Sequence, residues 1–208
     1  MSRPAQIKFL SRCAAAYDPI VQLMGFASLW RRLAAVAAPE PGQRVLDVCT
    51  GTGGAAFDLM GHGARVVGVD LAAGMLRHAR RKQQYNGSGP QFVRMDARRL
   101  AFPDRSFSLV TCAMALHEMA ETERQEVLRE MVRVARHRVV IADYRVPDTR
   151  LSSVLFRLRR AYEYVESDDF TQFVAHDFAA RLAHVGLTVE TAHDVGGFRI
   201  WRCLVRCP

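Results

Sequence analysis

The sequence predicts a doubly wound α/β fold, in which helices cover both faces of a mostly parallel β-sheet. Short apolar runs rich in valine alternate with amphipathic helical segments along most of the 208 residues. Glycines cluster directly after the first apolar run, and acidic residues follow the second and the third. Near the end of the chain, Gly196-Gly197 separates two more apolar runs, which is typical of a hairpin. We therefore expect a Rossmann-like sheet of seven strands whose last strand is antiparallel, because so short a link cannot join parallel strands.

The expected elements follow one another in chain order. Residues 1–38 form an N-terminal helical cap, with a break near Asp18-Pro19 because proline interrupts a helix. Apolar, β-branched runs bounded by turn residues predict strands at 44–48, 64–70, 91–95, 107–112, 139–142, 187–193 and 198–206. Helical spacing predicts helices at 55–60, 73–84, 121–135, 151–165 and 176–185.

Individual residues support these boundaries. The turn at Pro39–Gly42 leads into the first strand. Gly186 is placed to end the helix expected at 176–185. The helix at 121–135 has the clearest amphipathic pattern, with an apolar stripe formed by Val127, Leu128, Met131, Val132 and Ala135. No linker is long enough to divide the chain, so we expect a single domain over residues 1–208.

Composition restricts the possible functions. Hydrophobic residues make up 50% of the chain and charged residues 24%, which is ordinary for a globular protein and argues against disorder. The longest apolar runs are far shorter than the ~18–20 residues needed to cross a bilayer. The five scattered cysteines form no C-x-x-C pair, and no signal peptide is apparent, so we expect reduced thiols in a cytoplasmic protein.

The net charge of +8 is carried by 27 arginines and only 2 lysines. Such a basic chain can bind nucleic acid or an anionic membrane surface. The arginines are spread along the sequence, however, with dense groups only at 77–81, 136–138 and 157–160. This distribution favours solvated helix faces, and a functional basic face remains the alternative.

The residues that carry chemistry stand at the ends of the first three expected strands. The first strand runs through Asp47 and Cys49 into Gly51-Thr52-Gly53, a turn that lets a ligand approach the backbone. The second strand ends in Asp70, where an acid can accept hydrogen bonds from both hydroxyls of a ribose. The third ends in Asp96-Ala97, where a carboxylate beside a backbone amide can bind an adenine edge. This order indicates an adenosyl ligand.

Longer stretches around these residues resemble a known family. The segments Val45–Gly53, Gly68–Leu76, Asp96-Ala97 and Leu100–Phe107 together are similar to the motifs of class I S-adenosylmethionine-dependent methyltransferases, whereas the G-x-G-x-x-G spacing of NAD-binding folds is absent. The resemblance implies the class I methyltransferase fold, S-adenosyl-L-methionine as cofactor and S-adenosyl-L-homocysteine as product. It implies a cofactor site formed by Tyr17, Asp47, Cys49, Gly51, Thr52, Gly53, Asp70, Leu71, Met75, Asp96, Ala97 and Ala113.

Segments outside this core narrow the resemblance. Four segments are similar to the ubiquinone/menaquinone-biosynthesis C-methyltransferase family, namely Tyr17–Ile20, Trp30–Arg32, Asp177–Leu187 and Gly196-Gly197. In that family the tyrosine of the Tyr-Asp pair lies near the cofactor, and the resemblance implies this role for Tyr17. Packing within a helix is the alternative for this residue.

The chain also departs from that family's pattern. Family members usually have an aspartate at the position of Gly54 and an Arg-Asn pair at the position of His117-Glu118. A Pro-Gly-Gly turn is replaced by Arg136–Arg138, and the residues after Gly197 are larger and more basic than usual. The resemblance therefore supports the cofactor and leaves the quinone-like acceptor open.

His117 follows the fourth expected strand, where class I methyltransferases place residues that face the transferred methyl group. Its imidazole suits proton removal from an acceptor, because an ordinary histidine has a pKa of about 6.5, and Glu118 could orient the ring. Three roles remain open: catalytic base, shaping of the cofactor or acceptor pocket, and a helix terminus without a role. The other six histidines have no partners at metal-ligand spacing, and we expect no metal site.

Tyr144 ends the fifth expected strand on the same edge of the sheet, where it either faces the acceptor or caps the strand. The helical segment 150–166 follows. Its apolar side suits a lid over an apolar acceptor, a peripheral contact with a membrane surface, or ordinary packing. With Met114 and Leu116 nearby, it suggests an aromatic or prenylated acceptor that water must not reach.

We therefore expect a methyltransferase that acts on a small aromatic or prenylated acceptor, with C-methylation as in quinone biosynthesis the preferred interpretation. One alternative is a nucleic-acid methyltransferase, but the stretch Thr111–His117 lacks the Asn/Asp-Pro-Pro-aromatic motif of base amino-methyltransferases. The other alternative is an adenosyl-binding module without catalysis. We expect no nucleic-acid partner, and the sequence leaves the oligomeric state open.

Overall fold

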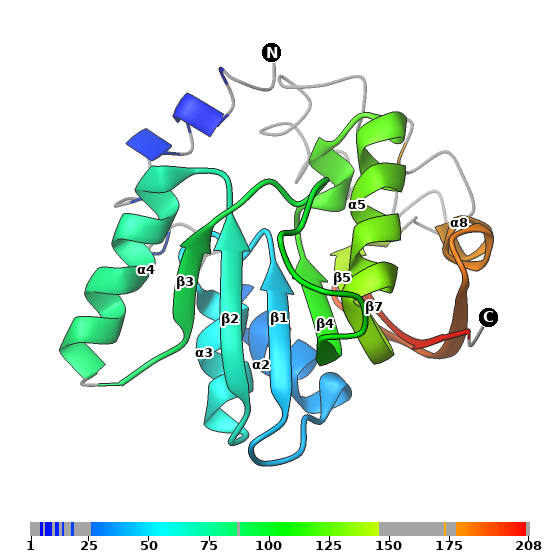
Figure 1. Ribbon diagram of the computed structural model, residues 1–208, viewed down its shortest axis with the longest axis horizontal. Helices are drawn as coiled ribbons and strands as arrows, with labels where there is room; N and C mark the ends of the chain where they lie inside the picture. The colour runs from blue at the N-terminus through cyan, green and yellow to red at the C-terminus, as the bar shows by residue number, and fades with distance from the viewer. Residues whose placement is uncertain are drawn as a thin grey trace.

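The computed structural model describes residues 26–86, 88–145 and 178–206, together with the separate positions 5, 7–9, 11, 12, 14, 18 and 173. These residues form a seven-stranded sheet in the order β3-β2-β1-β4-β5-β7-β6 (Figure 1). The strands are β1 (Arg44–Val48), β2 (Arg65–Asp70), β3 (Gln91–Arg94), β4 (Phe107–Ala113), β5 (Ala135–Tyr144), β6 (Leu187–Val195) and β7 (Phe198–Val205).

The central strands are buried on both faces, which explains their continuous apolar sequences. In β1, Val45, Leu46 and Val48 are fully buried between β2 and β4, with which β1 pairs in parallel. Strands β1 to β5 are all parallel, whereas β7 lies antiparallel between β5 and β6. The hairpin that joins β6 to β7 turns at Gly196, whose positive φ of 59° suits glycine. The expected antiparallel last strand is confirmed.

Helices cover both faces of this sheet. They are α2 (Phe26–Ala37), α3 (Gly54–Gly61), α4 (Ala73–Asn86), α5 (Glu121–Val134) and α8 (Phe178–His184), with a short 3-10 turn η1 (Leu116–Glu118) after β4. In Figure 1, α2 and α3 lie behind the sheet and α5 lies in front of it, while α8 packs beside β6. Within the described ranges, no helix is both long enough and apolar enough to cross a membrane.

Strand β5 is longer than the sequence predicts. It begins at Ala135, directly after α5, instead of at residue 139. Arg136 and His137 are exposed, because this end of the strand extends beyond the core and needs no apolar side chains. Pairing of Ala135 with Phe107 of β4 holds the backbone there. The other strand boundaries differ from expectation by at most two residues.

Helix α2 lies within the expected cap of residues 1–38, of which residues 1–25 are described only at separate positions. The expected lid at 150–166 lies outside the described residues. The cap contacts the start of α4 through a small apolar cluster of Ile7, Ala14, Ala72 and Met75. Gly74 permits this contact, because a Cβ at that position would lie 2.1 Å from the backbone oxygen of Ser11.

Candidate active site

A hollow opens at the carboxyl edge of the sheet, beside the ends of β1 and β4. Its walls come from the loop between β1 and α3, from α2 and from the last residues of β4. The residues that line it are Trp30, Asp47, Cys49, Thr50, Gly51, Thr52, Gly54, Ala55, Ala113 and Met114. Five predicted cofactor residues therefore share one hollow: Asp47, Cys49, Gly51, Thr52 and Ala113.

The loop between β1 and α3 uses backbone angles that side chains rarely adopt. Cys49, Gly51 and Gly53 have positive φ angles of 56°, 55° and 83°. A Cβ on Gly51 would meet no atom within 4 Å, so the space beside its backbone is open to a ligand. The Gly53 N–H closes the loop by donating to the Thr50 carbonyl at 2.8 Å. The loop therefore has the accessible glycine backbone that the sequence predicts.

Asp70 ends β2, and its carboxylate is fixed next to this loop. Oδ2 accepts a hydrogen bond from the Gly51 N–H and Oδ1 accepts one from the Ala72 N–H, both at 2.8 Å. Burial raises the pKa of Asp70 above its ordinary value, and these two N–H donors oppose the shift. The residue as a whole is half-buried, and each carboxylate oxygen keeps a further lone pair for a ligand hydrogen bond.

Asp47 supplies a second carboxylate, at the floor of the hollow, where the residue is 2% exposed. Its oxygens accept hydrogen bonds from the hydroxyls of Thr50 at 2.6 Å and Thr111 at 2.7 Å. Burial raises the pKa of Asp47 to about 6, and both threonines oppose this shift. At neutral pH the hollow therefore contains a buried negative charge that suits a cationic ligand group.

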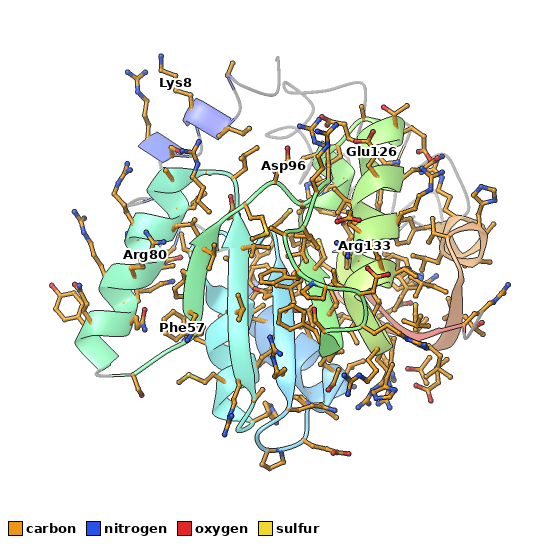
Figure 2. The ribbon with its side chains drawn as sticks, in the orientation of Figure 1. Lys8, Phe57, Arg80, Asp96, Glu126 and Arg133 are labelled. Carbon is orange, nitrogen blue, oxygen red and sulfur yellow. The ribbon has the colours of Figure 1, made fainter. Side chains whose placement is uncertain are left out.

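Asp96 follows β3 and lies at the same edge of the sheet (Figure 2). Its carboxylate pairs with Arg98, whose Nη2 lies 2.7 Å from Oδ2. It also accepts the backbone N–H of Arg98 at 3.0 Å, and Arg98 reaches Glu123 of α5 at 3.3 Å. An adenine amino group at this position would therefore share the carboxylate with a guanidinium, which the sequence did not indicate.

Thr52 connects the loop to the N-terminal cap. Its hydroxyl donates to the carboxylate of Asp18, which also accepts a hydrogen bond from Lys82 Nζ at 2.8 Å and lies 3.1 Å from His78 Nε2. Burial alone would raise the pKa of Asp18, but the hydrogen bonds from Lys82 and Thr52 lower it below the ordinary value. One ionised carboxylate therefore ties the cap to the loop and to α4.

The remaining described residues of the predicted cofactor site do not line the hollow. Gly53 stands at the start of α3, and Leu71 follows Asp70 in a half-buried position. Met75 packs against the cap, and Ala97 belongs to the main core. The predicted residue Tyr17 lies outside the described residues.

The two predicted catalytic residues, His117 and Tyr144, are in contact. Their rings meet edge to face, with centroids 4.8 Å apart and an angle of 83° between the planes. His117 Nδ1 also lies 2.7 Å from Oδ1 of Asp143, the residue before Tyr144 in β5. All three residues are buried.

Of the two carboxylates beside the imidazole, Glu118 is the more distant. Oε1 of Glu118 lies 3.9 Å from His117 Nε2, beyond hydrogen-bond distance, and this side chain is 40% exposed. Asp143 holds the ring instead. It lies 26 residues from His117 in the sequence, and the two meet because β4 and β5 pair side by side.

Arg124 is a residue of this region that sequence reasoning missed. Its side chain is 1% exposed and donates hydrogen bonds to the carbonyl of Leu116 at 2.9 Å and to that of Met119 at 2.7 Å. It thereby fixes the η1 turn that carries His117. The spacing of Arg124 from Val127 and Leu128 places it on the buried stripe of α5, a signal that could have revealed it.

Trp30 of α2 is another missed residue, and it explains one departure from the similar family. A Cβ on Gly54 would lie 2.6 Å from the indole nitrogen of Trp30. The aspartate that related sequences usually have at this position is therefore incompatible with this placement of Trp30. The indole lines the hollow where that carboxylate would stand.

Comparison with known proteins gives the family. Residues 45–138 match a model described as a methyltransferase domain. A demethylmenaquinone methyltransferase from Thermus thermophilus is 36% identical over 155 residues, which cover 71% of this chain and 70% of that protein. The chain belongs to the class I S-adenosylmethionine-dependent methyltransferases. Their cofactor is S-adenosylmethionine.

Further relatives of this methyltransferase are named for quinone biosynthesis. The ubiquinone/menaquinone biosynthesis C-methyltransferase UbiE of Pseudomonas paraeruginosa is 34% identical over 161 residues, covering 73% of this chain and 61% of that protein. The chain spans between 50% and 70% of the length of the first curated relatives it matches.

Solved structures share the fold at low sequence identity. A methyltransferase in complex with the activator Trm112 from Haloferax volcanii is 17% identical, with a TM-score of 0.71 and coverage of 95% of this chain and 98% of that chain. The magnesium protoporphyrin IX methyltransferase from Synechocystis, solved with bound S-adenosylhomocysteine, is also 17% identical. Its TM-score is 0.60, and coverage is 95% of this chain and 83% of that chain.

Proposed function

We propose that this methyltransferase transfers the methyl group of S-adenosylmethionine to a ring carbon of a small aromatic acceptor. Two findings support the acceptor class. The relatives named for menaquinone and ubiquinone C-methylation are 34–36% identical to this chain. The described residues also include a continuous series of aromatic rings that begins at the hollow and reaches His117.

The hollow fits the cofactor in charge and in backbone geometry. When bound, S-adenosylmethionine supplies an electrophilic methyl group on a positively charged sulfur. We assign the open backbone at Gly51 to the cofactor's close approach and Asp70 to the ribose hydroxyls. Asp47 provides the negative charge opposite the cofactor's cationic groups, and Asp96-Ala97 lies where the adenine edge is expected.

The single observation that carries the acceptor class is this series of rings, which we call the aromatic wall. Trp30 lines the hollow, and each further ring contacts the one before it, with centroid distances of 4.8–5.8 Å. The wall consists of Trp30, Phe26, Phe198, Tyr144 and His117. Of these rings only Trp30 lines the hollow and the other four are buried, so we infer that an acceptor reaching the wall would be flat and apolar.

The proposal is tested by following a labelled methyl group from S-adenosylmethionine into three acceptors: a short-chain prenylated naphthoquinol, duplex DNA and transfer RNA. We expect label in the naphthoquinol alone. Phe198→Leu removes a ring of the wall and should raise KM for the naphthoquinol by about 3–10-fold. Tyr85→Leu, at a 90% exposed tyrosine on α4, is the matched control and should leave KM unchanged. Label in nucleic acid, or none in the quinol, contradicts the proposal.

A further inference from the structure

Asp143 holds His117 from several directions at once. Its Oδ1 lies 2.7 Å from His117 Nδ1 and accepts the Tyr144 N–H at 2.8 Å. Its Oδ2 accepts the N–H groups of Leu116 at 3.1 Å and His117 at 3.3 Å. The carboxylate is thus the common acceptor for the η1 turn and the end of β5. Because this carboxylate already accepts three backbone N–H groups, we assign it the acceptor role here too, so that Nδ1 carries the hydrogen and Nε2 the lone pair.

We propose that His117 accepts the hydroxyl proton that the aromatic acceptor gives up when it attacks the methyl group, and that Asp143 is the positioning residue for this base. The proposal rests on the proposed function, because it needs an acceptor with an ionisable hydroxyl group. His117 stands, with Glu118, where the similar family usually has an Arg-Asn pair, and the proposal adds no metal or second cofactor.

The proton and electron balance is as follows. His117 Nε2 takes the proton of the acceptor's ring hydroxyl, and the resulting phenolate attacks through its adjacent ring carbon. A carbon–carbon bond forms to the methyl group while the sulfur–methyl bond breaks, and its electron pair stays on sulfur, giving S-adenosylhomocysteine. The methylated ring carbon then loses its hydrogen as a proton to water. The phenolate recovers a proton from the His117 imidazolium, so one proton is released in total.

The surroundings of His117 favour a fixed ring with a defined orientation. Tyr144 meets the imidazole edge to face, and the ring of Phe173 lies 6.4 Å from the imidazole and 4.9 Å from the Arg124 guanidinium. Among the described residues, the charged or titratable groups near the imidazole include Asp143 and Tyr144 of β5, Glu118 of η1 and Arg124 of α5. Such fixed geometry is what a general base needs and what a surface histidine lacks.

The position of His117 relative to the hollow agrees with this role. Ala113 and Met114 line the hollow at the end of β4, and the η1 turn follows directly. Arg124 holds both ends of that turn through the carbonyls of Leu116 and Met119. His117 is therefore attached by a short, immobilised connection to the part of the sheet edge where the cofactor's methyl group is expected.

The experiment measures kcat and KM against pH with the prenylated naphthoquinol, and cofactor affinity by calorimetry. We expect His117→Asn to lower kcat by roughly 10²–10⁴-fold while the Kd of S-adenosylmethionine stays unchanged. His137→Asn, at an exposed histidine of β5, is the matched control and should keep the wild-type kcat. In the wild type, kcat should fall on the acidic side as His117 becomes protonated.

Asp143→Asn removes the carboxylate that stabilises the protonated ring, so kcat should fall and the acidic limb of its pH profile should move to lower pH. Added imidazoles should restore part of the activity of His117→Ala in proportion to their basicity, which a purely structural role would not produce. A wild-type rate that does not fall at low pH, or wild-type kcat in His117→Asn, overturns the dyad even if the variants fold poorly. Cofactor binding without any transfer by the wild type contradicts the proposed function instead.

Discussion

The buried Asp47 carboxylate lowers the stability of the folded protein when it is ionised. Its pKa is about 6 in the folded protein, against an ordinary value of 3.8. Between these two pH values the folded protein binds a proton that the unfolded chain does not bind. The free energy of unfolding therefore falls as pH rises through this window, and ionisation of this group costs up to about 3 kcal/mol. Functional sites commonly retain such destabilising groups.

We predict that Asp47→Asn removes this pH dependence. The asparagine keeps a hydrogen-bonding group opposite each of Thr50 and Thr111, so the packing should survive. Near pH 7.5 the variant should be more stable than the wild type by about 1–3 kcal/mol, and near pH 4 the difference should vanish. Urea unfolding from pH 4 to pH 8 measures this, and parallel curves for the two proteins would show that Asp47 is not the group responsible. Cofactor affinity should decrease in the same variant.

At the scale of the elements, α4 provides the surface on which the N-terminal cap docks. Gly74 stands in its first turn, with the backbone of Ser11 directly against it. Further along α4, His78 and Lys82 contact the carboxylate of Asp18, which also accepts the Thr52 hydroxyl of the cofactor loop. Displacement of the cap from α4 should therefore also disturb the cofactor loop, because Thr52 would lose its hydrogen bond to Asp18.

We predict that Gly74→Ala destabilises the protein and weakens cofactor binding, although alanine ordinarily stabilises a helix relative to glycine by about 1 kcal/mol. The new methyl group would lie 2.1 Å from a backbone oxygen, which cannot yield as a flexible side chain can. Gly61→Ala in α3 is the matched control, because a Cβ there meets no atom within 4 Å. Thermal unfolding and calorimetry test the pair. A Gly74→Ala variant as stable as Gly61→Ala would show that the cap does not dock this way.

The architecture of the whole molecule could be predicted from the sequence because it depends on patterns that repeat along the chain. Buried parallel strands need apolar runs, and the hairpin needs a residue such as Gly196. The meeting of Asp47 and Asp70 at one edge was also predictable, since both lie at or near the ends of parallel neighbouring strands. The start of β5 at Ala135 could not be predicted from the sequence, because the exposed end of a strand has no pattern of apolar residues.

Contacts between residues far apart in the sequence could not be predicted, for a different reason. Glu118 is next to His117 in the sequence, so it was the natural partner for the imidazole, yet neighbouring residues point in different directions. Asp143 is 26 residues away and reaches the ring through strand pairing. Such partners depend on side-chain geometry, which no periodicity encodes.

Part of the positive charge of the whole molecule is paired with acidic side chains within the fold. Several described arginines form ion pairs within the chain, namely Arg98, Arg124, Arg133, Arg145, Arg181, Arg199 and Arg202. Arg133 alone contacts Glu130 at 2.7 Å and Asp104 at 2.6 Å. These arginines therefore stabilise helices, loops and the β6–β7 hairpin within the fold.

The central claim is that S-adenosylmethionine binds over the glycine loop with its ribose on Asp70. The most direct measurement is a calorimetric titration of S-adenosylmethionine into the wild type, Asp70→Ala and the control Asp104→Ala, whose carboxylate is 73% exposed. Asp70→Ala should weaken binding by about 1.5–3 kcal/mol, or roughly 10–150-fold in Kd, because hydrogen bonds to a charged group are lost. Asp104→Ala should bind like the wild type. Equal affinity in all three proteins would contradict the account.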